Sequence, residues 1–427
     1  MNLFTTFAKL TITKKLTMTI DQYVNDAVAL LKQLIATPSI SRDESAAADI
    51  MEQAMRSYGY EPERIGNNLL IKSSSWDDNR PTILLNAHID TVKPVSTWTR
   101  DPFTPTIEGD RLYGLGSNDC GGGLVSLLQV FRAVHSSQFT VHSANYIYLA
   151  SCEEEVSGAG GIRAVLPSLP KVDVAIVGEP TGMQPAIAER GLMVIDGVAH
   201  GKSGHAARGE GINAIYQALD DLLFIRDYKF QRVSSLLGET KMQCTILNSG
   251  TQHNVVPDEC RFTIDVRSNE LYTNEEIFEF LQGKLKSDLK ARSFHLHSSS
   301  LFSSEDDTSL RDYDTAQVPT IRGYATTIRE QARYNKSQTS NLKPSLGSAA
   351  FTKREARLKE ISNLFLRKFT ELSMQPFGSP TLSDQALMRF PSFKLGPGES
   401  SRSHSADEYI CISEIQHAID TYLQLLA

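Results

Sequence analysis

Apolar positions in the first 180 residues follow two spacings, one typical of helices and one typical of buried strands. Residues 20–35 repeat apolar side chains every three or four positions, with Asp21 as a candidate N-cap, and Pro38 follows the pattern. Strands alternating with such helices predict an α/β sheet covered by helices on both faces. The candidate strands are the short apolar runs 68–72, 82–87, 144–150 and 172–177, and the other candidate helices are 44–58 and 124–131.

The pattern changes after Arg190. From there to about residue 300 the chain reads as a separate α+β unit of about 100 residues, a common domain size. The expected strands are 193–199, 242–247 and 260–266, and the expected helices are 214–228 and 274–289.

Residues 302–375 have the character of flexible surface, apart from an amphipathic helix expected at 353–372. Strand-and-loop character returns at Pro376, and helical spacing at 412–426 closes the chain. We therefore expect four parts: a catalytic domain, an inserted domain, a partly flexible connecting segment and an N-terminal extension. Their residues are 18–189 with 376–427, 190–300, 301–375 and 1–17.

Composition narrows the class of protein. The 427 residues are 41% hydrophobic and carry a net charge of −7, which gives no electrostatic footprint for nucleic acid. No apolar run approaches the length that spans a bilayer. Five cysteines, an odd number without a C-x-x-C spacing, predict neither a disulfide framework nor a cysteine-based zinc site, and a reducing cytoplasm is the expected location.

His88 and Asp90 follow the apolar run that begins at Thr82. Being two residues apart, they point to the same side of a strand. Asp90 could then accept a hydrogen bond from one ring nitrogen of His88 while the other nitrogen binds a metal ion. The pair alone is weak evidence, because a histidine at the end of a strand is more often structural.

Acidic residues also stand where other predicted strands end. Glu153 and Glu154 follow the run 144–150, and Glu179 follows the run 172–177. Open α/β sheets place their ligands at the carboxyl ends of strands, and acids beside a buried strand are costly without a cation. Singly, each could be a surface carboxylate or the start of a turn. Mixed histidine and carboxylate sites suit Zn²⁺ or Co²⁺.

Five motifs in a fixed order carry a resemblance to a known family. The chain resembles the M20 peptidases, which are dinuclear-zinc amidohydrolases and exopeptidases, over residues 21–292 and again from 376. The motifs are His88-Ile-Asp90, Asn118-Asp119 before a run of glycines, Glu153-Glu154, Gly178-Glu179-Pro180 and Ser403-His404.

The resemblance implies a zinc-peptidase-like catalytic domain, with a mixed sheet between helices, that holds two Zn²⁺ ions; Co²⁺ can substitute. His88, Asp119 and Glu179 would bind one ion, and Asp119, Glu154 and His404 the other, so that Asp119 bridges. Glu153 would be the general base and Asp90 the partner of His88. The family resemblance also implies a cis peptide bond between Asp119 and Cys120.

The inserted domain carries weaker matches. His205, in Lys202-Ser-Gly-His205, resembles a histidine that stabilises the oxyanion in the neighbouring subunit, which implies a homodimer through residues 190–300. Arg190, Asn254 and Arg267 resemble substrate-binding positions. The plainer alternatives are a turn with an exposed imidazole for His205, and surface side chains or ion pairs for the other three.

The expected activity is hydrolysis of an N-acyl amino acid, with N-acetylornithine, an arginine precursor, as the favoured substrate. The alternatives are desuccinylation of succinyl-diaminopimelate or N-succinylornithine, a dipeptidase, and a non-catalytic binding relative. Two features depart from the family. Cys120-Gly121 replaces the Met-Lys that many relatives have, and the 302–375 segment is longer than usual.

Overall fold

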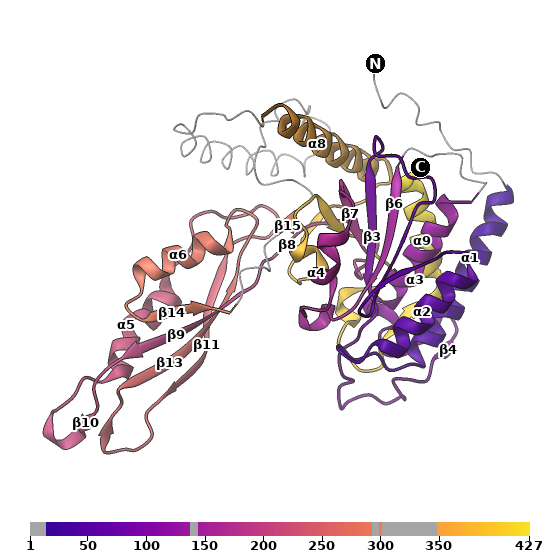
Figure 1. Ribbon diagram of the computed structural model, residues 1–427. Coiled ribbons are helices and arrows are strands. Elements are labelled where there is room, and N and C mark those ends of the chain that lie inside the picture. Colours follow the sequence, from indigo (N-terminus) through magenta and orange to yellow (C-terminus); the bar gives the residue numbers. More distant parts are fainter. Residues whose placement is uncertain (1–13, 137–143, 293–298, 301–347) are drawn as a thin grey trace. The chain divides into compact units, whose positions relative to one another are not determined.

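The computed structural model describes residues 14–136, 144–292, 299–300 and 348–427 (Figure 1). These residues form two compact units. The first contains the chain up to Ile187 together with 347–377 and 383–427, and the second contains 188–346 with 378–382. Most of the expected extension 1–17, and residues 301–347 of the expected connecting segment, lie outside the described residues.

The first unit is built on a mixed sheet, and this confirms the predicted fold class. β3 runs parallel to both β6 and β7, and β17 runs parallel to β7, whereas β1, β2 and β8 pair antiparallel to their neighbours. The strand order is β1-β2-β6-β3-β7-β17-β8. The strands are β1 (Glu63–Ile65), β2 (Asn68–Lys72), β3 (Thr82–His88), β6 (Asn145–Ser151), β7 (Val174–Val177), β8 (Ala186–Glu189) and β17 (Ser392–Lys394).

Helices cover both faces of this sheet, as its alternating side chains require. Leu84 and Ile147 point to the face covered by α4, where they pack with Ile162. On the other face, the hydroxyl of Tyr148 donates to the backbone carbonyl of Leu124 in α3 (2.9 Å), and α1 and α9 pack against α3 (Figure 1). These helices are α1 (Lys14–Ile35), α2 (Ser45–Ser57), α3 (Gly122–Val134), α4 (Ile162–Val165) and α9 (Ile412–Leu426).

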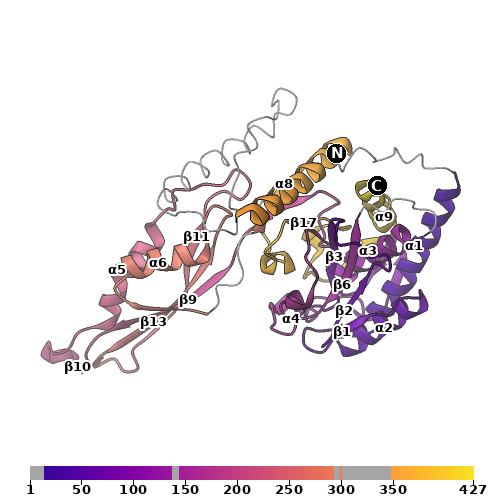
Figure 2. The ribbon, with the colours of Figure 1, turned by 45° about the horizontal axis from the view of Figure 1, so that its top comes forward.

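Helix α8 (Ser348–Glu371) belongs to the first unit, and not to a separate connecting segment (Figure 2). It packs against β7 and α9. Phe365 and Phe369 are buried and contact the ring of Phe393 in β17, with ring centroids 5.1 Å apart in both pairs. Arg357 of α8 also forms an ion pair with the buried Asp173 (2.9 Å). The apolar face of this amphipathic helix therefore packs into the core of the first unit.

Two glycines allow α3 to begin against the end of β7. A Cβ atom added to Gly123 would lie 1.7 Å from the carbonyl oxygen of Gly178, so no other residue fits there without movement. This close approach brings the turn before α3 next to Glu179. A small three-stranded sheet, β18-β5-β4, adjoins the same turn. Its strands are β4 (Thr106–Glu108), β5 (Arg111–Tyr113) and β18 (Tyr409–Cys411).

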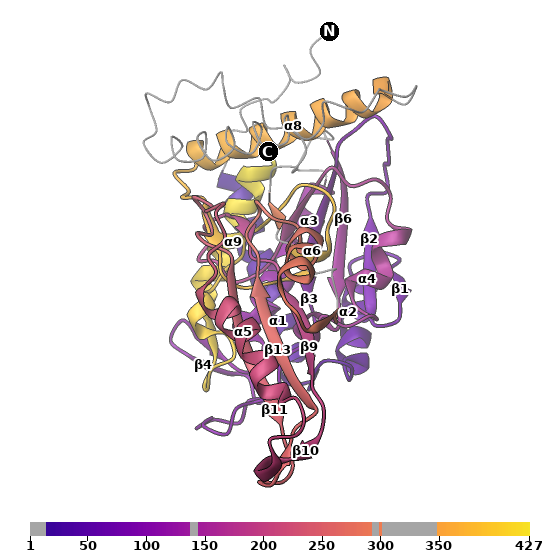
Figure 3. The ribbon, with the colours of Figure 1, turned by 90° about the vertical axis from the view of Figure 1, so that its left-hand side faces the viewer.

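The second unit has an antiparallel sheet in the order β11-β13-β9-β14, with α5 and α6 packed against it (Figure 3). Its core includes Ile195, Phe262, Ile264 and Leu281. Helix α6 ends at Lys284, earlier than predicted, because residues 288–291 pair with β9 as a strand. The elements are β9 (Met193–His200), β10 (Gly204–His205), α5 (Ala214–Asp227), β11 (Lys241–Ser249), β12 (Val255–Val256), β13 (Glu259–Arg267), α6 (Asn274–Lys284), β14 (Asp288–Ala291) and β15 (Ser299–Ser300); β16 (Phe377–Ser379) pairs with β8.

Within the part of the chain that the structure describes, no helix has both the length and the apolar character needed to cross a membrane.

Candidate metal centre

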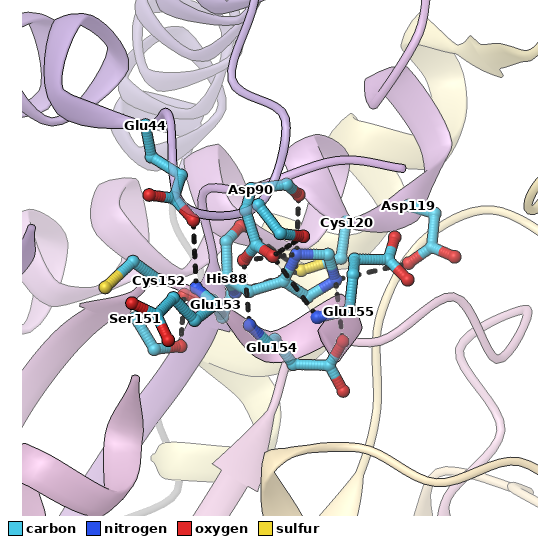
Figure 4. A network of polar contacts seen from close by, with 12 residues as sticks. Glu44, His88, Asp90, Asp119, Cys120, Ser151, Cys152, Glu153, Glu154 and Glu155 are labelled. Carbon is cyan, nitrogen blue, oxygen red and sulfur yellow. Dashed lines mark hydrogen bonds and ion pairs between the residues drawn. The ribbon is translucent and has the colours of Figure 1, made fainter. Parts of the chain in front are cut away.

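The expected metal-binding side chains gather near the carboxyl ends of β3, β6 and β7. Figure 4 shows His88, Asp119 and Glu154 of this set. His88 is the last residue of β3, and Asp119 lies in the turn that leads into α3. Glu179 follows β7, and His404 lies in the loop before β18. The parallel strands bring these distant residues to one edge of the sheet, where ligands of open α/β sheets bind.

His88 lies at the centre of this cluster and is almost fully buried. Its Nε2 atom is 3.3 Å from Oδ1 of Asp119, 3.8 Å from Oε1 of Glu179 and 4.0 Å from Oε2 of Glu154. A buried histidine facing three carboxylates is a poor structural element but a good ligand set.

A second histidine approaches Asp119 from the other side. Nε2 of His404 is 3.5 Å from Oδ2 of Asp119 and 2.9 Å from Oε2 of Glu155. The two oxygens of Asp119 thus face two different histidines, as a carboxylate shared between two ions requires. His404 has a positive φ of 56°, so the loop is sharply turned where it presents this ring.

The places expected of Glu153 and Glu154, which follow β6, are taken by the next residues, Glu154 and Glu155. The carboxylate of Glu153 turns away from His88 and accepts the backbone N–H of Gly160 (3.2 Å), which argues against the role of general base expected of it (Figure 4). Glu155, which the sequence analysis did not select, takes the place next to His404 that was expected of Glu154. Glu154 instead lies nearest His88.

Backbone conformation explains this shift. Glu153 has a φ of 53°, a left-handed conformation that an alternating strand pattern does not anticipate, and a 3₁₀ turn follows it. The turn carries Glu154 and Glu155 toward the histidines and leaves Glu153 against the glycines of 158–161. A Cβ on Gly158 would lie 1.8 Å from Oε2 of Glu153, so this glycine makes room for the displaced carboxylate.

Asp90 also differs from its predicted role. Nδ1 of His88 bonds to the backbone carbonyl of Asp90 (2.8 Å), while the carboxylate oxygen Oδ1 is 3.6 Å away. The carboxylate instead accepts the backbone N–H groups of Glu154 (3.1 Å) and Glu155 (3.2 Å) and the hydroxyl of Ser41 (2.7 Å). Asp90 therefore orients His88 through its main chain and holds the acidic turn through its side chain.

Glu44 is a fully buried carboxylate that supports the same turn from the start of α2. It accepts the backbone N–H of Glu153 (3.2 Å) and the side-chain amide of Asn67 (3.3 Å). Three successive N–H groups of the acidic turn thus meet buried carboxylates. Sequence patterning could not single out Glu44, because its partners lie far away in the chain.

The electrostatics of the cluster are those of carboxylates crowded out of water. Burial raises the pKa of Glu154 well above its usual range, and burial together with Asp119 raises the pKa of Glu179 to about 8. The hydrogen bond to Glu155 raises the pKa of His404 to about 9. These raised pKa values indicate that the buried cluster lacks positive charge. Protons or a cation can supply that charge.

Two unpartnered carboxylate oxygens also indicate a site that lacks positive charge. Among the described residues, Oε1 of Glu155 and Oε1 of Glu179 are buried without a hydrogen-bond partner. The donor atoms of His88, Asp119 and Glu155 lie within 4.8 Å of one another, and so do those of His88, Cys120 and Glu179. Unpartnered carboxylate oxygens that converge with a histidine fit a metal ion of the Zn²⁺ class.

The model of peptidase family M20/M25/M40 matches residues 84–427 of this chain. The chain belongs to this family. It is therefore a metal-dependent peptidase or amidohydrolase.

Two similar M20 relatives have different substrates in their names. An acetylornithine deacetylase from Proteus mirabilis is 31% identical over 287 residues, which cover 62% of this chain and 72% of the relative. A succinyl-diaminopimelate desuccinylase from Wolbachia pipientis is 26% identical over 271 residues, which cover 60% of this chain and 68% of the relative. At these identities the family is shared, while the substrate remains to be assigned.

Solved structures share the M20 fold at lower identity. The aminopeptidase PepT from Bacillus cereus has a TM-score of 0.63 at 16% identity, with 94% of this chain and 97% of that chain covered. The YXEP protein of Bacillus subtilis, described as a dinuclear metal-binding M20 peptidase, has a TM-score of 0.62 at 14% identity, with 95% and 98% covered.

The predicted residues of the second unit have hydrogen-bond or ion-pair partners within that unit. His205 is exposed on β10, and its Nδ1 accepts the backbone N–H of Ala207 (3.2 Å). Arg267 is paired with Asp265 (2.8 Å), and Arg190 donates to the backbone carbonyls of Leu237 and Glu239. The backbone carbonyl of Asn254, which precedes β12, accepts the backbone N–H of Ala206 (3.0 Å).

Cys120 stands where many M20 relatives have a methionine, and the smaller side chain is still buried. The thiol is buried, accepts the backbone N–H of His88 (3.2 Å), and has a pKa raised to about 12, chiefly by burial. It therefore acts as a small core residue beneath His88. The peptide bond between Asp119 and Cys120 is cis, which confirms the expectation from the family.

Proposed function

We propose that this M20 protein hydrolyses the amide bond of an N-acyl amino acid, with N-acetylornithine as its first substrate. The observation that carries the proposal is the placement of Asp119 between His88 and His404, with Glu154 and Glu155 beside it. Together with Glu179, these side chains would supply two sets of three ligands, with the carboxylate of Glu154 left over. The 31% identity to an acetylornithine deacetylase supports the choice of acyl group.

The ligand set divides into two groups that share Asp119. His88, Asp119 and Glu179 would hold one Zn²⁺ ion, and Asp119, Glu155 and His404 the other, with Co²⁺ as a substitute. Ions bound there would polarise the amide carbonyl and lower the pKa of a bound water toward neutrality. Relative to the sequence prediction, Glu155 takes the ligand role of Glu154.

Glu154 becomes the general base in this assignment. It is the remaining carboxylate of the cluster, lying 4.0 Å from Nε2 of His88, and burial raises its pKa well above its usual range. A carboxyl with a raised pKa can take a proton from the attacking water and return it to the departing amine near neutral pH. The carboxylate of Asp90 accepts the backbone N–H of Glu154, and this hydrogen bond fixes the position of the Glu154 main chain.

Succinylated substrates are the second candidate, because desuccinylases are among the similar relatives. A succinyl group carries an additional carboxylate that needs a cation. In the structure, Arg267 is engaged by Asp265, and Arg190 by backbone carbonyls. Since each already has a partner, the acetyl substrate is favoured over the succinyl substrate. A dipeptide is third.

We further propose that the protein is a homodimer through its second unit. Helix α5 exposes Ile215, Tyr216, Leu219 and Leu223, and Tyr216 is 70% exposed. Strand β11 lies at the end of its sheet order and exposes Ile246 and Leu247. An apolar helix face beside an edge strand is a surface that a second copy would cover. His205, on β10 of the same unit, would then reach the partner's site and stabilise the oxyanion.

A kinetic screen tests the substrate assignment. The purified protein with added Zn²⁺ or Co²⁺ is assayed for amine release from N-acetylornithine, N-succinylornithine, succinyl-diaminopimelate and a dipeptide. We expect the highest kcat/KM with N-acetylornithine and at least a 10²-fold lower rate for Glu154→Gln, the general-base loss being about 10²–10⁴-fold. A preference for a succinylated substrate would replace the acetyl assignment, and no hydrolysis of any of them would overturn it.

A further inference from the structure

Glu408 is a buried carboxylate that contacts the turn of Asp119 without belonging to the ligand set. Its Oε1 accepts the backbone N–H groups of Asn118 (2.8 Å) and Asp119 (2.9 Å), and its Oε2 accepts that of Gly116 (3.1 Å). The side chain is only 2% exposed. All three donors are main-chain groups of the turn that carries the expected bridging ligand.

Glu408 also stands four residues after His404 in the same loop. The backbone carbonyl of Glu408 accepts the N–H of Gly114 (3.0 Å), and β18 begins at the next residue and pairs with β5. The loop is therefore joined on one side to the Asp119 turn and carries a metal-binding histidine on the other. The side chain of Glu408 thus holds the backbone of the Asp119 turn, while its main chain continues the loop that carries His404.

The alternative is that Glu408 only completes the hydrogen bonds of a buried turn. That role would contribute to stability alone, since unsatisfied buried N–H groups are costly. A buried carboxylate beside Asp119 is an expensive way to satisfy them, because the two negative charges repel. A neutral side chain would serve a purely structural purpose at lower cost.

We propose that Glu408 is a positioning residue that fixes Asp119 relative to His404 and thereby sets the affinity of the second metal position. The proposal rests on the ligand set given above, but not on the identity of the substrate. Its test measures metal binding without substrate, so that a wrong substrate assignment would not affect the result.

The experiment titrates metal-free protein with Zn²⁺ against a fluorescent chelator and with Co²⁺ by its visible absorption. Removing a group that orients a ligand typically costs about 10–100-fold in metal affinity. We expect Glu408→Ala to lose this much affinity for the second equivalent of metal, and the first equivalent to lose less, because Asp119 is shared but His88 and Glu179 are untouched. The affinity of Glu408→Gln for the second metal should lie between those of the wild type and Glu408→Ala, because its amide oxygen can still accept the backbone N–H groups of Asn118 and Asp119.

Asp221→Ala is the matched control. Asp221 is 3% exposed, lies in the second unit, and likewise accepts backbone N–H groups, those of Lys286 and Ser287. We expect it to lower the melting temperature but to leave both metal affinities unchanged. Wild-type affinity for the second metal in Glu408→Ala, or an equal loss in Asp221→Ala, would overturn the proposal. If Glu408→Ala does not fold, unchanged affinity in Glu408→Gln would overturn it in the same way.

Discussion

Glu155 and His404 are 249 residues apart in the chain, yet Oε2 of the first lies 2.9 Å from Nε2 of the second. This contact is the reason why Glu155, and not Glu153 or Glu154, is the proposed partner of His404 in the candidate metal site. The neighbouring carboxylates point elsewhere, Glu153 toward Gly160 and Glu154 toward His88. The three glutamates therefore have three different environments, and substitutions can distinguish them.

The three acids should respond differently to the same change. We expect Glu155→Gln to lose metal, because it removes a proposed ligand charge. Glu154→Gln should keep both metals and lose about 10²–10⁴-fold in kcat. Glu153→Gln, the matched control, should retain both metal and most activity. Metal content by mass spectrometry and steady-state kinetics on the three variants check this, and a kcat collapse in Glu153→Gln with Glu154→Gln active would restore the original register.

Asp384 provides a pH-dependent contribution to stability. It is buried, accepts the hydroxyl of Ser151 (2.5 Å), and has a pKa raised from 3.8 to about 6, chiefly by burial. Because the pKa of Asp384 is raised in the folded state, its contribution to the free energy of unfolding is fully present only below about pH 3.8. This contribution is lost as the pH rises through about 6. Asp384→Asn mimics the neutral form, so its stability relative to the wild type should increase over this range, by up to roughly 3 kcal/mol.

Urea unfolding of the metal-free proteins between pH 4 and 7 measures this effect. Asp77→Asn is a useful control, because hydrogen bonds from Asn79 lower the pKa of the exposed Asp77. A lowered pKa stabilises the fold above the unfolded value and loses that effect only as the pH falls below about 3.8, so the difference between this control and the wild type should stay nearly constant between pH 4 and 7. A difference between Asp384→Asn and the wild type that does not vary with pH would contradict the prediction.

A charge placed on the exposed face of α5 should separate the proposed dimer. We expect Leu219→Lys to be monomeric by sedimentation, because a lysine in an apolar interface would be desolvated without a partner. Glu279→Lys, on the exposed side of α6, is the control and should remain dimeric. Metal content should be unchanged in both variants. A dimeric Leu219→Lys would show that the subunits associate through another surface, and a monomeric wild type would show that they do not associate at all.

The role of His205 can be tested with mixed dimers. Each single variant should be weak, since loss of one oxyanion donor costs about 10²–10³-fold in kcat. If His205 acts in the partner's site, a mixed dimer of His205→Ala and Glu154→Gln chains contains one site with both an intact base and an intact histidine. We expect tagged, purified mixed dimers to recover activity at one site in two. No recovery would mean that His205 acts within its own subunit or not at all.

Local patterns predicted most of the elements well. The helix at 412–426 follows from its apolar spacing, and the strands at 68–72 and 82–87 follow from short apolar runs that are buried almost throughout. The end of α6 was missed, since the pairing of β14 with β9 is a long-range contact that helical spacing does not reveal. The clustering of His88, Glu154 and Glu179 was predictable because neighbouring parallel strands bring the residues at their carboxyl ends to one edge of the sheet.

The register of the acidic triplet and the supports of the site were not predictable in the same way. Glu153 turns away because of a left-handed backbone that no side-chain pattern encodes. Glu44 and Glu408 look like ordinary surface acids in the sequence, although both are buried and bind backbone N–H groups far along the chain. A stretch of glycines after Glu155 was the one local sign that a turn had to fit there.

The position of β17 in the central sheet has a consequence for how the chain folds as it is synthesised. β17 lies between β7 and β8, although it is made only after residue 390, and α9, which packs on α1 and α3, follows it. Chains emerge from the ribosome at about 5–20 residues per second, and domains generally fold as units. The second unit can therefore fold while the sheet of the first still has an open gap. We expect the nascent first unit to expose apolar strand edges until its last strand arrives, which makes this the stage most dependent on chaperones.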